Sequence, residues 1–151
     1  STWGSRGGVR GNAIKIWDVS ANQPRLVDSV LVANATTTGD VQVSDDGSLL
    51  LVAIESNPNG GVALYSLADP RRPQLLVRTT GGELRYGVHT AELARVGGVL
   101  YAFCAVDPAS GVPARLVVLD LSDPRAPRTV FSRIMGNPFV HDVFVRDGLL
   151  F

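Results

Sequence analysis

Residues 116–127 read LVVLDLSDPRAP, an apolar run that stops abruptly at a turn containing two prolines. Weaker copies lie upstream: IKIWDVS at residues 14–20, before QPRL, and VALYSL at residues 62–67, before DPRRP. The matching prolines Pro24, Pro73 and Pro127 are 49 and 54 residues apart. A repeat of this length indicates a chain built from similar structural units in succession.

A second pattern recurs between these copies. It reads GDVQVSDDG at residues 39–47, HTAEL at residues 89–93 and HDVFV at residues 141–145, and its starting points are 50 and 52 residues apart. An Asp-Gly or Gly-Gly pair closes each copy, as is typical of a tight β-hairpin. Two patterns with one period of about 50 residues predict propeller blades of four strands.

Each unit divides into four expected strands. The first alternates polar and apolar residues, and the second is rich in leucine and valine. The third is the apolar run itself, whose unbroken β-branched and aliphatic character indicates burial on both faces. The fourth is shorter and more polar, as suits an outer edge strand. The expected first strands are 41–43, 90–93 and 142–145, and the expected fourth strands are 26–32, 75–79 and 129–132.

One segment has a competing interpretation. Residues 89–95 read HTAELAR and contain good helix formers. In the repeat, however, Ala91 and Leu93 match Val41 and Val43 of the preceding copy. We therefore expect a strand, because tertiary context commonly overrides intrinsic propensity.

The expected fold is an all-β propeller fragment of four-stranded antiparallel blades. Residues 1–151 form a single propeller segment: 1–34 end one blade, 39–87 and 89–140 are two blades, and 141–151 start the next. This amounts to about three blades. Propellers usually have four to eight, so the chain alone does not close the ring. We expect the remaining blades in the same, longer chain or from self-association.

The composition excludes several classes of function. Apolar residues make up 45% and charged residues 19%, which is typical of a folded protein. Fourteen basic residues balance fourteen acidic ones, so no nucleic-acid partner is predicted. The single cysteine, Cys104, excludes an intrachain disulfide framework and a cysteine zinc cluster. No apolar segment is long enough for a spanning helix, so no membrane insertion is predicted.

The segment at residues 116–124, LVVLDLSDP, resembles the signature of the LVIVD-repeat β-propellers, and HDVFV at 141–145 is similar to their inner strand. The middle copy departs from the pattern at Ser66 and Ala68, and the first lacks the Asp-Pro pair. The resemblance implies a scaffold more than an activity. It also implies an extracellular, periplasmic or cell-surface protein.

A more distant resemblance is to the propellers of selenium-binding proteins and methanethiol oxidases. Residues 40–46, DVQVSDD, match one of their repeat patterns locally. The metal-binding histidines and reactive cysteine of that group have no counterparts here that can be placed residue by residue, so no catalytic residue is carried over.

The first strand of a propeller blade lines the central channel. Just before it lie His89 and His141 in successive blades, with Asp40 and Asp142 at the next position of their repeats. Imidazole is a common metal ligand and titrates near neutral pH, so the two histidines suggest a metal or base at the channel mouth. Alternatively, each histidine locks its blade through a hydrogen bond to a loop carbonyl, which is the interpretation we favour.

Two further carboxylates, Glu55 and Asp107, begin the long loops between second and third strands, and we expect those loops on the same face. Variable loops on one face commonly bind ligands. Turn formation alone also explains the composition of these loops, and it is the interpretation we favour.

The sequence thus predicts a propeller scaffold, part of a larger protein, that binds a protein or small molecule at the channel face. No nucleophile elbow, metalloprotease histidine pair or zinc-spaced cysteine set is present, which weighs against an enzyme. No cofactor is predicted, and His89 and His141 leave a metal ion open. The alternative is a metal-dependent oxidase or hydrolase with its site at the channel.

Overall fold

The structure is a computed structural model that describes residues 2–136 and 140–151. Residues 137–139 of the predicted blade 89–140, and Ser1 of the predicted segment 1–34, lie outside the described residues. Twelve strands form antiparallel sheets of two or four strands, and the helical structure assigned in the described ranges is one 3-10 turn, Leu84–Tyr86. The predicted all-β fold is confirmed.

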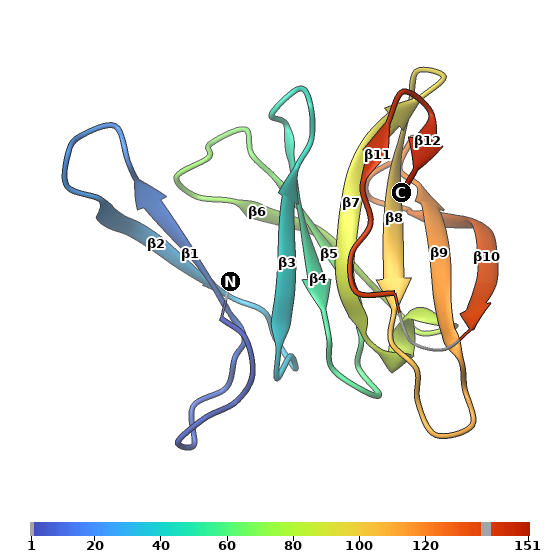
Figure 1. The fold of residues 1–151 in the computed structure, drawn as a ribbon. Helices are drawn as coiled ribbons and strands as arrows, with labels where there is room; N and C mark the ends of the chain where they lie inside the picture. The colour runs from blue at the N-terminus through green and yellow to red at the C-terminus, as the bar shows by residue number, and fades with distance from the viewer. Residues whose placement is uncertain (1, 137–139) are drawn as a thin grey trace.

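Two four-stranded sheets follow one another along the chain, each with its strands in sequence order (Figure 1). The first contains β3 (Thr38–Val43), β4 (Leu49–Ile54), β5 (Gly61–Ser66) and β6 (Gln74–Thr80). The second contains β7 (Val88–Val96), β8 (Val99–Val106), β9 (Ala114–Asp120) and β10 (Arg128–Gly136). Each is a meander of the kind that makes a propeller blade.

Two shorter hairpins flank these sheets. At the start, β1 (Ala13–Asp18) pairs with β2 (Arg25–Leu31), and at the end β11 (Val145–Arg146) pairs with β12 (Leu149–Leu150). In the repeat, the first hairpin corresponds to third and fourth strands and the last to first and second strands. The sheets do not close on themselves, so the chain has the fold of an open β-propeller fragment (Figure 1).

Residues 88–96 form a strand, which rules out the helical alternative. β7 pairs along its length with β8, and Val88 and Ala91 are buried. Tertiary packing therefore prevails over the helix propensity of HTAELAR.

Three details of the strand predictions are wrong. The outer strands β6 and β10 have seven and nine residues, so they are not shorter than their neighbours, although every residue of β10 except the last is exposed. β11 begins at Val145 instead of Asp142. β1 is not buried on both faces: its Trp17 is 49% exposed, because one hairpin alone cannot cover both sides.

The core lies between the sheets. Apolar residues of β4 and β5, including Leu51 and Leu64, pack in one cluster with those of β8 and β9, including Leu119. All three leucines have no exposed surface. A second cluster joins the opposite side of the first sheet to the opening hairpin through Ile14 and Val32. These contacts place the inner strands β3 and β7 side by side (Figure 1).

Both ends of the row of sheets expose apolar side chains. At one end Trp17 and Leu31 of the first hairpin are exposed, and at the other Phe131, Ile134 and Met135 of β10. Such surfaces are typical of positions that a neighbouring element covers. That further blades cover them, in cis or by self-association, stays a prediction.

The ends of the strands define two faces. We use the name loop face for the end at which the chain enters β3 and β7. At this end, residues 55–60 and 107–113 connect the second strand of each sheet to the third. We call turn face the opposite end, with the turns at residues 44–48, 67–73, 97–98 and 121–127. The loop face is at the bottom of Figure 1 and the turn face at the top. The described residues include no helix with the length and apolar character needed to span a membrane.

Candidate functional site

His89 lies in a β-bulge where β7 begins on the loop face. Val88 pairs with Val106 and Thr90 pairs with Ala105, so His89 is one extra residue opposite β8. A bulge of this kind bends the strand and redirects a side chain. β3 has an equivalent irregularity between Thr38 and Val41. The repeat therefore includes a redirected position before each of these inner strands.

Glu55 and Asp107 occupy equivalent places, one residue after the ends of β4 and β8. The Glu55 N–H donates to the Thr37 carbonyl at 3.1 Å, and the Asp107 N–H donates to the Gly87 carbonyl at 2.9 Å. Each acidic residue is thus attached by its backbone to the segment that enters the inner strand of its own blade. This backbone geometry is the same in both blades, so each blade has one carboxylate at the equivalent position beside the start of its inner strand.

His89 lies between these two carboxylates. Its Nδ1 is 3.1 Å from Glu55 Oε1 and 4.0 Å from Asp107 Oδ1. The three side chains are only 15–22% exposed. Asp107 belongs to the blade of His89, whereas Glu55 belongs to the preceding blade. The cluster therefore bridges two blades, and its ligand atoms all lie within 4.8 Å of one another.

The electrostatics of the cluster favour protonation of one carboxyl group. Burial is the largest cause that raises the pKa of Asp107, the nearby charge of Glu55 is the next, and the pKa reaches about 6. His89 and, more weakly, His141 act in the opposite direction. Two carboxylates held this close repel each other, so the pair is poised to gain a proton or a cation.

His141 lies beside His89 and outside the three-residue cluster. The two imidazole rings meet edge to face, with centroids 4.7 Å apart and planes inclined by 67°. The Thr90 hydroxyl donates to the His141 carbonyl at 2.9 Å, which ties the second inner strand to the approach of the next. The prediction that two histidines from successive blades point to a common place agrees with this arrangement.

A polar groove extends from the two histidines along the inner strands. Its volume is about 400 Å³, and it is lined by Trp3, Gly39, Asp40, Gln42, His89, Thr90, His141 and Asp142. The structure thus brings all six predicted site residues to the loop face. Asp40 and Asp142 line the groove with the histidines, whereas Glu55 and Asp107 contact His89 and are not among the lining residues.

Glu92 lies three residues after His89 in β7 and adds to the acidic character of this part of the loop face. Burial is the largest cause that raises its pKa, followed by the charges of Asp40 and Asp142. Asp40 itself accepts hydrogen bonds from the Val41 N–H at 2.7 Å and from the Gln42 amide at 3.3 Å. Two carboxylates, Asp40 and Asp142, thus line the groove, and the charge of both raises the pKa of the nearby Glu92.

Gly39 stands where the repeat has histidine in the next two copies, and packing explains why. A Cβ atom at residue 39 would lie 2.5 Å from the His89 carbonyl oxygen. The backbones of the two inner strands approach too closely there for any side chain. Close packing of these two blades therefore requires glycine at residue 39, where the other copies have histidine.

The turn face has a different arrangement of charges. Two of its aspartates, Asp18 and Asp120, form ion pairs with arginines. Arg71 binds Asp18 at 2.7 Å and Arg128 binds Asp120 at 2.9 Å. Local ion pairs thus balance the charges of Arg71 and Arg128 within the chain.

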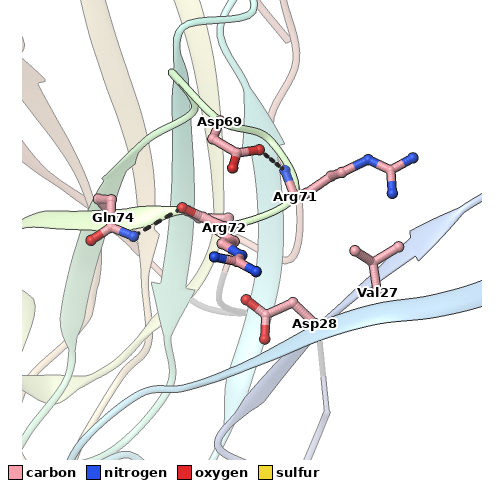
Figure 2. Close-up of a pocket in the computed structure, with 7 residues that line it drawn as sticks. Val27, Asp28, Asp69, Arg71, Arg72 and Gln74 are labelled. Atoms are coloured by element: carbon pink, nitrogen blue, oxygen red, sulfur yellow. Dashed lines mark hydrogen bonds between the residues drawn. The ribbon is translucent and has the colours of Figure 1, made fainter.

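Figure 2 shows the cavity on this face, of about 570 Å³, lined by Val27, Asp28, Asp69, Arg71, Arg72, Pro73 and Gln74. The Arg71 N–H donates to Asp69 at 3.0 Å, and the Gln74 amide donates to the Arg72 carbonyl at 3.1 Å (Figure 2). These bonds build the turn between β5 and β6. Because acidic and basic side chains alternate around it, the cavity has no single charge preference.

Cys104 and Trp3 lie in opposite surroundings. Cys104 is fully buried, and burial raises the pKa of its thiol to about 12, as expected of an inert packing residue. Trp3 is 61% exposed and donates its indole N–H to Glu55 Oε2 at 2.9 Å. It is a residue of the loop face, held there by hydrogen bonding.

Sequence reasoning missed Trp3 and Glu92 as members of the site. Glu92 was detectable in principle, because it replaces Gln42 at the matching position of the inner strand. Trp3 carries no comparable signal, since no repeat position corresponds to it.

Comparison of the chain with models of known protein families gave no match, and comparison with curated proteins gave none. The candidate site therefore rests on its own geometry.

Proposed function

We propose that this chain is part of a propeller scaffold that binds, in the groove of the loop face, a ligand carrying a cationic group. The observation that carries the proposal is that Asp40, Asp142 and Trp3 line the same groove. No lysine or arginine is among the described residues that line it. Carboxylates beside an exposed indole are suited to an ammonium or guanidinium group.

The neighbouring charges support this choice of ligand. The pKa of Glu92 is raised partly by Asp40 and Asp142, so these carboxylates repel one another. A cation in the groove relieves that repulsion, whereas an anion increases it. The LVIVD-like motif supports the scaffold role, because the third strands that it specifies carry none of the groove residues.

Fluorescence of Trp3 tests the proposal directly. In a Trp17→Phe variant Trp3 is the sole tryptophan, so its emission reports on the groove. Titration with arginine amide tests a small ligand, and titration with a tetra-arginine peptide tests a peptide ligand. A tetra-glutamate peptide serves as the probe of opposite charge.

We expect a saturable change with at least one cationic probe. Asp40→Asn should weaken it about tenfold, since a hydrogen bond to a charged group is worth ~1.5–3 kcal/mol and Asp40 is half-buried. Asp142→Asn should weaken it less, because Asp142 is exposed. Asp69→Asn on the turn face is the matched control and should leave the titration unchanged. Tighter binding of the peptide than of arginine amide identifies a protein segment as the ligand. No saturable change, or an equal response in the Asp40→Asn variant, overturns the proposal.

The second candidate function is a metal-dependent oxidase or hydrolase, and one observation favours it: the juxtaposition of Glu55, His89 and Asp107. Such an enzyme needs a bound metal with an open coordination position. Hydrolysis of p-nitrophenyl acetate that requires added Zn²⁺ and is lost in the Asp107→Asn variant would support this candidate. Absence of Zn²⁺-dependent turnover with a panel of activated esters would count against a hydrolase.

A further inference from the structure

We propose that Glu55, His89 and Asp107 bind one divalent transition-metal ion at the junction of two blades. The proposal goes beyond ligand binding in the groove and does not depend on it, because Asp40 and Asp142 take no part in the metal site.

The donor atoms have the arrangement that such an ion requires. His89 Nδ1 is 3.1 Å from Glu55 Oε1 and 4.0 Å from Asp107 Oδ1, and all three donors lie within 4.8 Å of one another. Nitrogen and oxygen ligands bind zinc at ~2.0–2.2 Å, so small rotations of these side chains bring all three donors onto one ion. The residues come from three separate segments, each fixed by strand pairing or backbone hydrogen bonds.

The charge of the cluster also calls for a cation. No arginine or lysine in the described ranges forms an ion pair with Glu55 or Asp107, for which His89 is the ion-pair partner. One divalent ion neutralises the two carboxylates completely. On the turn face, by contrast, the guanidinium groups of Arg71 and Arg128 balance the charges of Asp18 and Asp120.

The surroundings orient the donors. The indole N–H of Trp3 binds the second oxygen of Glu55 at 2.9 Å, which leaves Oε1 directed to His89. Gly87 makes room for Asp107: a Cβ atom at residue 87 would lie 3.2 Å from Asp107 Oδ2. Hydrogen-bonded supports of this kind are typical of metal ligands.

The donor set selects the class of metal. An imidazole nitrogen suits zinc, cobalt, nickel or copper, whereas calcium and magnesium prefer oxygen ligands alone. Three protein ligands leave a coordination position open, as in catalytic zinc sites.

Cobalt substitution gives a readout independent of activity. The full chain, freed of metal with a chelator, is titrated with Co²⁺ and monitored by visible absorption, then with Zn²⁺ by calorimetry. We expect one site per chain, a ligand-field absorption typical of low coordination, and no binding of Mg²⁺ at equal concentration. Glu55→Gln, His89→Gln and Asp107→Asn should each weaken Zn²⁺ binding by more than about tenfold.

One matched variant acts as a control. Asp69→Asn removes a carboxylate of the turn face and should leave Zn²⁺ affinity within about threefold of the unchanged protein. Circular dichroism establishes that each variant keeps its β structure.

Zinc binding that survives all three ligand substitutions is adventitious and overturns the proposal, as does absence of binding. Loss on His141→Ala with retention in Glu55→Gln also overturns it, since the ligands would then be the two histidines. The groove proposal fails separately, through the Asp40→Asn and Asp142→Asn titrations.

Discussion

The carboxylates of the loop face and those of the turn face differ in how their charge is balanced. On the turn face, hydrogen bonds from Ser20 are the main cause that lowers the pKa of Asp18 to about 2, with Arg71 contributing less. The pKa of Asp120 is likewise lowered, first by Ser122 and then by Arg128. On the loop face, burial and neighbouring carboxylates raise the pKa of Asp107 to about 6.

This difference in pKa distinguishes acidic residues with a structural role from those that are candidates for function. Asp18 and Asp120 accept bonds from residues two positions later, so they build the turn that follows their own strand. Glu55 and Asp107 instead face a histidine across a blade junction. A carboxylate that the fold keeps close to another carboxylate costs stability, and such a cost is typical of a binding or catalytic site.

The largest loss of stability is expected when a side chain is added at Gly39, between the inner strands β3 and β7. Gly39→Ala places a Cβ atom 2.5 Å from the His89 carbonyl oxygen, so the backbone must move. Overpacking typically costs ~1–3 kcal/mol, and the upper end of that range is expected here because the clash is with a backbone atom. Denaturant unfolding should show a loss of about that size.

Gly47→Ala on the turn face is the matched control. Its Cβ would meet nothing within 4 Å, and only the positive φ of 71° opposes the change. A left-handed alanine costs ~1 kcal/mol. If the two variants lost equal stability, the loop-face strands would not be packed as closely as the structure indicates.

A smaller effect of opposite sign is expected from Asp107→Asn in the presence of a chelator. The folded pKa of about 6 lies above the ordinary value of 3.8, so the folded state resists ionisation and loses stability as pH rises between these values. Removing the carboxylate should therefore stabilise the protein at pH 7.5 by ~1–2 kcal/mol.

The pH dependence is the sharper part of this prediction. The gain should be complete above about pH 6 and should disappear as the pH falls below the ordinary pKa of 3.8, because the carboxyl group is then neutral in both the folded and the unfolded state. Thermal unfolding at several pH values measures it. A gain that is independent of pH would show that Asp107 is ionised at no greater cost than a solvent-exposed residue.

The smallest effect is expected on the turn face. Asp18→Asn removes a carboxylate whose pKa is lowered to about 2, so it should destabilise the protein near neutral pH. The loss should fade as the pH falls through the range between 3.8 and about 2, because the folded advantage of the ionised form ends there. Thermal unfolding of Asp18→Asn beside Asp107→Asn should give shifts of opposite sign.

The repeat made most of the architecture predictable. The spacing of the LVVLD-like strands located both four-stranded sheets, because each blade needs one buried third strand and one proline-rich exit turn. The edge properties were harder to predict. β10 is nine residues long, since strand length depends on its pairing with β9 and not on its own polarity.

The site was only partly predictable for a similar reason. His89, Glu55 and Asp107 were recognisable as loop-face residues from their repeat positions, but their convergence depends on a bulge that adds one residue opposite β8. A bulge has no reliable sequence signal when the inserted residue is not glycine. Trp3 joins the site through a single hydrogen bond across 52 residues of chain, which no local pattern encodes.

Carboxyl-carbon NMR of the metal-free protein tests most directly whether the two faces differ as described, since Asp107 and Asp18 titrate in the same sample. The structure predicts midpoints of about 6 for Asp107 and about 2 for Asp18. His89→Gln should raise the Asp107 midpoint further, because His89 lowers it. Midpoints of both residues near the ordinary value of 3.8 would contradict the account.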